Sequence, residues 1–214
     1  MRWPAGFPSA FFPGVPRLFL DPLLYAFLFL GLFSPGPNVI MLTASGARFG
    51  FRASLPHLFG VVLGVGVIGA VTALGVGVLV LASPVLGNVL RALAAAWILY
   101  MAWNYYKATR SPAGMVEDEG TPMTLWQAVL FQWINPKVWA VAFAASAGYG
   151  AGMAPSWEAA RLATAFSSVN LGVCLFWTSA GALLTTLLRS PRRWQVFMRI
   201  MALLLALSAA MVFL

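Results

Sequence analysis

The stretch FLGLFSPGPNVIML, residues 29–42, is apolar along most of its length, yet it contains Pro35-Gly36-Pro37 at its centre, followed by Asn38. Proline removes a backbone amide donor and clashes with the preceding turn, so a helix stops there. In lipid, the freed carbonyl and amide groups need partners in protein or in a water-filled cavity. The stretch therefore predicts two half-helices that meet at a polar, unwound break inside a membrane.

The composition of the whole chain also indicates a membrane protein. Of 214 residues, 61% are hydrophobic and only 8% are charged, and the mean hydropathy is +0.87. Ordinary soluble domains are roughly half apolar and about a quarter charged. We therefore expect an all-α integral membrane protein with the lipid bilayer as its surroundings. The net charge of +8 does not indicate a nucleic-acid partner, because the basic residues lie in short loops rather than on one face.

The hydrophobic pattern predicts six transmembrane helices. A helix needs about 20 apolar residues to cross a bilayer, and six segments approach or exceed that length. The first segment is broken at Pro35-Gly36-Pro37, and the fourth is broken at Asn135-Pro136. The six segments cover residues 18–47, 58–82, 85–106, 122–150, 159–188 and 195–214.

The positions of the two breaks predict an internal repeat. Each broken segment is followed by two further segments, so residues 18–106 and residues 122–214 resemble two copies of one three-helix unit, joined by a loop at 107–121. Three spans are an odd number, so the second copy must be inverted relative to the first. Inverted repeats with discontinuous helices at matching positions are typical of secondary transporters, whose binding site lies at the breaks. Residues 1–17 precede this transporter domain as an N-terminal extension.

The first break has the chemistry of an anion-binding site. A half-helix that begins near Pro37 offers free N–H groups and the positive end of a helix dipole, for which a carboxylate is a natural ligand. Gly36 lets the backbone approach a ligand closely, and Asn38 can form a hydrogen bond with a polar group. The alternative is an ordinary proline kink with a structural role only.

The second break, in FQWINPKVWA, mirrors the first and adds a positive charge. Asn135 and Pro136 form the break, and Lys137 follows them. A lysine within a membrane costs about 2.5–3.5 kcal/mol on insertion scales and marks a functional candidate. The alternative is that Lys137 extends to the membrane interface, where its ammonium group stays in water.

Lysine and arginine residues predict the orientation of the chain. Cytoplasmic loops are enriched in these residues, and here they concentrate in the first, third and fifth loops. The second loop has only Arg91 at its edge, and the fourth has only Arg161. The odd-numbered loops are therefore expected in the cytoplasm and both termini outside. The basic residues of the odd loops are Arg48, Arg52, Lys107, Arg110, Arg189, Arg192 and Arg193.

Other individual residues have modest predicted roles. Asp21 marks the outer end of the first segment, with a proton relay as the alternative, and His57, the only histidine, has a loop role. Gly60-x-x-x-Gly64 predicts close helix packing. Cys174 is the only cysteine, which excludes an internal disulfide. The sequence contains no HExxH, CxxC or Cys/His cluster, so we expect no metal site and no cofactor.

Three blocks of the chain resemble the LysE/RhtB family of amino-acid exporters. They are SPGPNVIMLTASGARFGFRASLPHLFGVVLGVG at 34–66, RALAAAWILYMAWNYYKA at 91–108 and AVLFQWINPKVWAVAF at 128–143. The resemblance extends over most of the chain from about Leu18 onward. It implies an inner-membrane (plasma-membrane) exporter of amino acids or close derivatives, such as basic amino acids, threonine, homoserine or homoserine lactones.

The resemblance also implies a mechanism and a site. Efflux would be energised by the proton gradient or the membrane potential and would proceed by alternating access, and the family is compatible with a homodimer. The partner would be a small amino-acid-like solute. Acidic residues within the membrane are scarce, so no proton-coupling residue is assigned. The family blocks place at the transport core Pro35, Gly36, Pro37, Asn38, Asn135, Pro136 and Lys137.

Three other classes of protein are alternatives to an amino-acid exporter. An exporter of inorganic or metal ions would need carboxylate, imidazole or thiol ligands inside the membrane, and beyond Asp21 there are almost none. An intramembrane enzyme would need a nucleophile with a base or a metal, and no such pair is visible, so we expect no enzyme. A non-transporting membrane scaffold would explain the hydrophobicity but not the two matched breaks.

Overall fold

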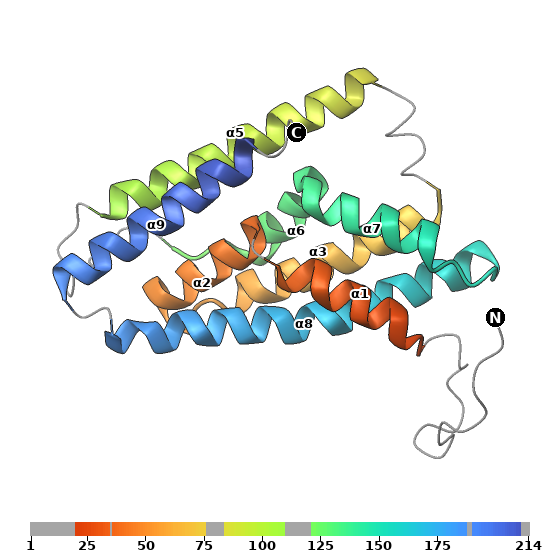
Figure 1. Cartoon of the computed structure of the whole chain (residues 1–214), viewed down its shortest axis with the longest axis horizontal. Coiled ribbons are helices and arrows are strands. Elements are labelled where there is room, and N and C mark those ends of the chain that lie inside the picture. The colour runs from red at the N-terminus through yellow and green to blue at the C-terminus, as the bar shows by residue number, and fades with distance from the viewer. Residues whose placement is uncertain (1–19, 35, 76–83, 110–120, 188–189, 211–214) are drawn as a thin grey trace, which may run out of the picture.

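The computed structural model describes residues 20–34, 36–75, 84–109, 121–187 and 190–210, and within these ranges the chain is helical without a strand (Figure 1). The predicted all-helical class is therefore confirmed. Pro35 and the extension at 1–17 lie outside the described residues. The helices are α1 (Pro22–Phe33), α2 (Pro37–Phe49), α3 (Leu55–Ala73), α5 (Pro84–Ala108), α6 (Leu125–Ile134), α7 (Pro136–Gly148), α8 (Pro155–Leu187) and α9 (Pro191–Ala210).

Both predicted breaks separate helices in the structure. The axes of α1 and α2 differ by 62°, and α2 begins with Pro37 after the N-cap Gly36. Asn135 is at once the C-cap of α6 and the N-cap of α7, which begins with Pro136. Proline suits the first position of a helix because the amide that it lacks would have no helical partner there.

Three to four of the six predicted spans are evident from the described residues. The helices α3, α8 and α9 are each long and apolar enough to cross a membrane, and the bent pair α1–α2 forms a fourth candidate. The helices α6 and α7 have 10 and 13 residues. At 1.5 Å per residue they extend about 15 and 20 Å, short of the roughly 30 Å hydrocarbon core. Each is therefore a half-length helix.

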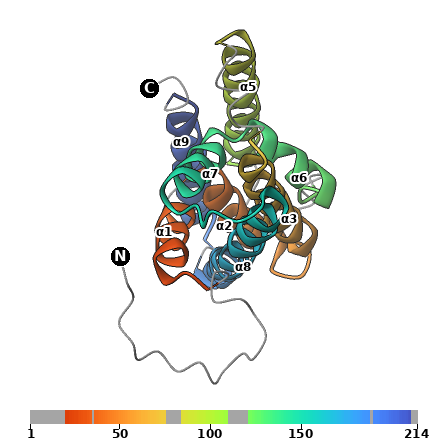
Figure 2. The same ribbon diagram turned by 90° about the vertical axis from the view of Figure 1, so that its right-hand side faces the viewer.

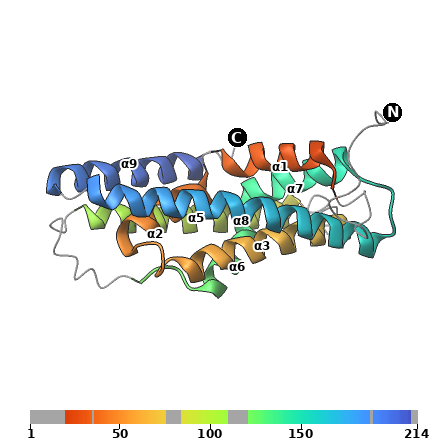
Figure 3. The ribbon, with the colours of Figure 1, turned by 90° about the horizontal axis from the view of Figure 1, so that it is seen from below.

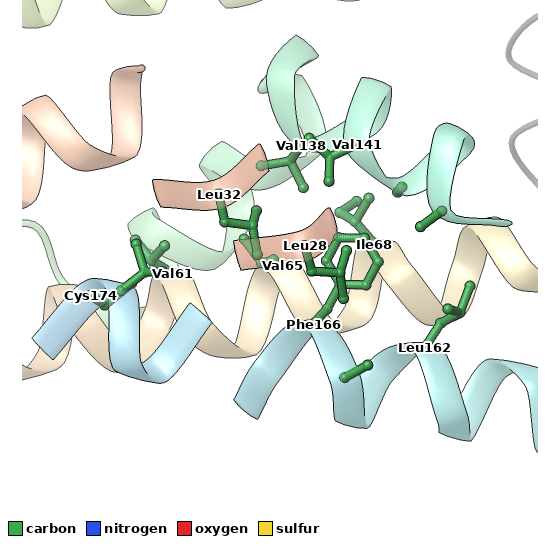
Figure 4. Packing of buried hydrophobic residues seen from close by; sticks show 14 of the residues in the cluster. Leu28, Leu32, Val61, Val65, Ile68, Val138, Val141, Leu162, Phe166 and Cys174 are labelled. Atoms are coloured by element: carbon green, nitrogen blue, oxygen red, sulfur yellow. The ribbon is translucent and has the colours of Figure 1, made fainter. Parts of the chain in front are cut away.

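The helices pack in two groups. The most extensive packing joins α3 to α8, seen along their lengths in Figure 3, while α2 and α1 also lie on α8 and α6 lies on α3. The helices α5 and α9 form a separate pair (Figures 1 and 2). One apolar core joins α1, α3, α7 and α8 through residues such as Leu28, Val65, Val138 and Phe166 (Figure 4). A second core joins α2, α5 and α9 and includes Phe131 of α6.

Glycines allow α2 and α8 to approach at backbone distance. A Cβ atom at Gly181 of α8 would lie 2.0 Å from the carbonyl oxygen of Thr43. A Cβ atom at Gly46 of α2 would lie 2.2 Å from the carbonyl oxygen of Thr178. Side chains cannot fit at these distances, so the two glycines fix how closely α2 packs on α8.

The packing role predicted for Gly60 and Gly64 is confirmed. A Cβ atom at Gly60 would lie 2.3 Å from the carbonyl oxygen of Leu125, and one at Gly64 would lie 2.6 Å from Cγ of Gln132. These contacts seat α6 directly against α3. The close approach brings the second break next to α3.

A buried ion cluster joins α1 to α8. Arg161 of α8 is only 2% exposed, and its guanidinium lies 3.2 Å from the Asp21 carboxylate and 2.8 Å from that of Glu158. It also donates to the carbonyl oxygen of Tyr149 at 2.9 Å. Asp21 accepts from the amide of Leu23 at 3.0 Å and so caps α1. Arg161 is therefore a buried structural residue of α8, whereas the charge pattern predicted a residue of the fourth loop.

Candidate functional site

The two helix breaks lie against each other, although they are separated by about a hundred residues in the sequence. Asn38, in the first turn of α2, donates from Nδ2 to Oε1 of Gln132 at 2.8 Å. Gln132, in the last turn of α6, donates from Nε2 back to Oδ1 of Asn38 at 3.3 Å. The two side-chain amides therefore form a reciprocal pair that links α2 to α6.

The rest of the polar cluster belongs to the second break. Gln132 is fully buried, and its Nε2 also donates to the carbonyl oxygen of Ala128 at 2.8 Å. Its Oε1 accepts from Nδ2 of Asn135 at 3.4 Å. The Oδ1 atom of Asn135 accepts from the backbone amide of Lys137 at 3.2 Å and so caps α7. In an apolar core such a network holds the ends of the half-helices in place, because unpaired polar groups are costly there.

Lys137 reaches from the second break to the first. Its ammonium group donates to the carbonyl oxygen of Ser34, the C-cap of α1. The C-terminal end of a helix carries a partial negative charge, which favours a cation. A Cβ atom on Gly36 would lie 2.7 Å from Cδ of Lys137. Glycine at position 36 therefore leaves the space that the lysine side chain occupies.

The start of α2 differs from the start of α7 in its capping. Gly36 offers no side-chain acceptor, and α2 has no side-chain cap. The first helical bond of α2 runs from the amide of Ile40 to the carbonyl of Gly36 at 3.0 Å, so the amides of Asn38 and Val39 precede it. At α7, by contrast, Asn135 supplies the cap. The N-terminus of α2 is thus suited to an acceptor that comes from outside the helix.

The structure brings together six of the seven residues named from the sequence; Pro35 lies outside the described residues. Gln132, which was not predicted from the sequence, lies at the centre of the cluster. Gln132 lies three residues before Asn135, a spacing that places both side chains on one face of a helix. This spacing is the feature of the sequence that could have predicted its place in the cluster. The six residues are Gly36, Pro37, Asn38, Asn135, Pro136 and Lys137. Within the described ranges, no group of three or more His, Cys, Asp or Glu residues lies together.

These features define a multi-pass membrane protein with two broken helices that meet through buried polar side chains. The model of the LysE type translocator family matches residues 29–214, and the chain belongs to that family. Its members are membrane transporters and not enzymes. The resemblance seen in the sequence is therefore confirmed.

The individual relatives are more distant. The chain is 31% identical over 105 residues to the cysteine/O-acetylserine efflux proteins of Salmonella typhimurium and Salmonella typhi. The matched region is 49% of this chain and 52% of each relative. An uncharacterised membrane protein of Pseudomonas aeruginosa is 31% identical over 110 residues, which are 48% of this chain and 51% of that protein. The chain thus spans about half the length of the curated relatives that it matches. No solved structure matches it significantly.

Proposed function

We propose that the protein exports small, neutral amino acids or their close derivatives across the inner membrane. The observation that supports this most is the contact between the two breaks, where Asn38 and Gln132 pair across α2 and α6. A kink with only a structural role would not need a second broken helix at the same place. Family membership supports transport as the class of activity.

The chemistry at the breaks suits a zwitterion. The uncapped start of α2 can accept a carboxylate, and the C-terminal end of α6 presents carbonyl groups that suit an ammonium group. The described side chains at the breaks are amides and one lysine, Lys137, without an acid, which favours a neutral amino acid over a basic one. The names of the Salmonella relatives make cysteine and O-acetylserine the first solutes to test; homoserine and threonine follow.

The proposed architecture has six spans in two inverted repeats. In this arrangement α1–α2, α3 and α5 correspond to α6–α7, α8 and α9. The pairing of α3 with α8 and of α5 with α9 supports this correspondence, since equivalent helices would then face each other. The odd-numbered loops would lie in the cytoplasm, and rocking of one unit against the other would give alternating access to the breaks. A homodimer is compatible with this scheme.

The test is release of amino acids from loaded cells. Cells with and without the protein are fed dipeptides that contain cysteine, serine or threonine, and a parallel culture accumulates O-acetylserine. We expect one or a few of these solutes to appear faster outside the cells that contain the protein. The Asn38→Ala variant should lose this release at equal membrane abundance. Asn88→Ala, on an exposed position of α5, is the matched control and should behave as the wild type.

The outcomes separate the alternatives. If no amino acid or derivative leaves faster, the proposed function is wrong, and inorganic ions become the next solutes to load. If solutes leave faster and Asn38→Ala is as active as Asn88→Ala, the protein is an exporter whose site lies elsewhere. A non-transporting scaffold would neither speed the release of any solute nor respond to Asn38→Ala.

A further inference from the structure

The helix α8 is unbroken and lies against both halves of the first broken span, α1 and α2 (Figure 1). Its contact with α1 includes the ring of Trp177, whose centre lies 5.2 Å from the ring centre of Phe33. Phe33 is the last residue of α1 and directly precedes Ser34, whose carbonyl oxygen accepts from the ammonium group of Lys137. Trp177 therefore lies beside the first break.

The indole N–H of Trp177 is buried and has no hydrogen-bond partner among the described residues. An indole at the second break is satisfied, because Nε1 of Trp139 donates to the carbonyl oxygen of Trp133 at 2.9 Å. Buried donors nearly always have a partner, and an indole N–H can only donate. An acceptor from outside the protein would satisfy the donor that the fold leaves beside the first break.

Two further side chains of α8 are buried without a partner. Oγ1 of Thr178, which has no exposed surface, forms no hydrogen bond with a described residue, and neither does Nδ2 of Asn170, which is 3% exposed. Thr43 and Thr72 show the usual bond of a helical threonine, since each donates to the carbonyl oxygen four residues earlier at 2.8 Å. Thr178 does not form this bond. With Trp177, three unpaired donors thus lie between positions 170 and 178 of α8.

These donors favour an acceptor on the side chain of the solute. In the proposed transport site, the start of α2 suits the carboxylate of an amino acid, and the end of α6 suits its ammonium group. The part of the solute that remains is its side chain. Buried donors that lose their partner strongly reject an analogue without the acceptor, whereas an apolar pocket discriminates much less.

We propose that α8 carries the side-chain specificity site of the transporter, in which the indole N–H of Trp177 donates to an oxygen of the solute side chain. The rings of Phe33 and Phe176, whose centres lie 5.2 and 5.3 Å from that of Trp177, hold the indole in place. Asn170 and Thr178 extend the row of donors along α8. The substrate class is then amino acids with a side-chain hydroxyl or ester oxygen rather than a hydrocarbon side chain. This inference rests on the proposed function.

The test compares O-acetylserine with norleucine, whose side chain has a similar length but no oxygen. The purified full chain is placed in liposomes, and the concentration of each solute that gives half-maximal transport is measured. For the wild type we expect this concentration to be about tenfold lower for O-acetylserine, as one net hydrogen bond would give. Trp177→Phe keeps an aromatic ring against Phe33 but removes the N–H. It should raise the concentration for O-acetylserine alone and so abolish the preference.

Trp194→Phe is the matched control. The indole N–H of Trp194 is also buried without a partner, but it lies in the second core, on α9, so this variant should keep the wild-type preference. Trp177→Phe removes no hydrogen bond within the protein, and its Tm should fall no further than that of Trp194→Phe. A loss of preference at such a Tm assigns the N–H to the solute rather than to the fold.

The outcomes separate the specificity site from the proposed function. If the wild type transports neither solute, the proposed function fails and the specificity site fails with it. If the wild type transports both solutes with equal half-maximal concentrations, export stands and the specificity site is wrong. The proposal is also overturned if Trp177→Phe keeps the preference, or if it weakens O-acetylserine and norleucine equally, since the indole would then act on the carboxylate that both share.

Discussion

Replacing Arg161 should destabilise the protein more than replacing either of the acidic residues that pair with it, Asp21 and Glu158. Arg161→Met leaves the carboxylates of Asp21 and Glu158 and the carbonyl of Tyr149 without their shared donor. Breaking a buried ion pair by removing one partner costs about 3–5 kcal/mol. Asp21 and Glu158 remain 26% and 13% exposed, so water relieves part of this cost and the lower end applies, about 3 kcal/mol.

The assay is thermal unfolding of the purified protein in detergent, followed by tryptophan fluorescence. A loss of about 3 kcal/mol corresponds to a fall in Tm of roughly 6–12 °C for a chain of this size. Asp21→Asn is the comparison: asparagine still caps α1, and a partly exposed ion pair contributes only up to about 1 kcal/mol. If Arg161→Met lowered Tm no further than Asp21→Asn, the ion cluster would not hold α1 to α8.

Three further predictions follow from the packing and from the breaks. Gly181→Ala should destabilise the protein by about 1–3 kcal/mol through overpacking against a carbonyl of α2. Gly172→Ala on the same helix is the control, because a Cβ atom there meets nothing within 4 Å. Equal Tm values for the two variants would contradict the close approach of α8 to α2. Gln132→Leu should lower stability by about 2 kcal/mol, because it leaves the side-chain amide of Asn38 and Nδ2 of Asn135 without the partner that Gln132 provides. Urea unfolding in detergent measures this, and wild-type stability would show that the network is not formed. Gly36→Ala should displace the Lys137 side chain and slow export with little change in Tm, and unchanged export would show that the lysine is not needed at that position.

Local chemistry in the sequence was sufficient to predict the two breaks and the starts of the helices that follow them. Pro37 and Pro136 are the first residues of α2 and α7, because proline tolerates that position and few others in a helix. The glycines at 60 and 64 predicted close packing for the same kind of reason: only a missing side chain permits it. Each of these predictions depends on residues within one turn of each other.

Contacts between distant segments were not predictable in the same way. Gln132 meets Asn38 across 94 positions, and the sequence around Gln132 resembles an ordinary apolar helix. Arg161 resembled a loop charge because its acidic partners include Asp21, which is 140 positions away. His57 resembled a loop residue, although it is buried in the first turn of α3. Side-chain partners of this kind are set by how the helices pack, which periodicity along the chain does not specify.

We propose that the paired breaks form the path for a small amino-acid solute. The most direct test is efflux of labelled O-acetylserine and cysteine from liposomes that contain the purified protein, with Asn38→Ala compared against Asn88→Ala. We expect efflux that requires the protein, is unchanged in Asn88→Ala, and falls at least tenfold in Asn38→Ala. Efflux that is the same in both variants would contradict it.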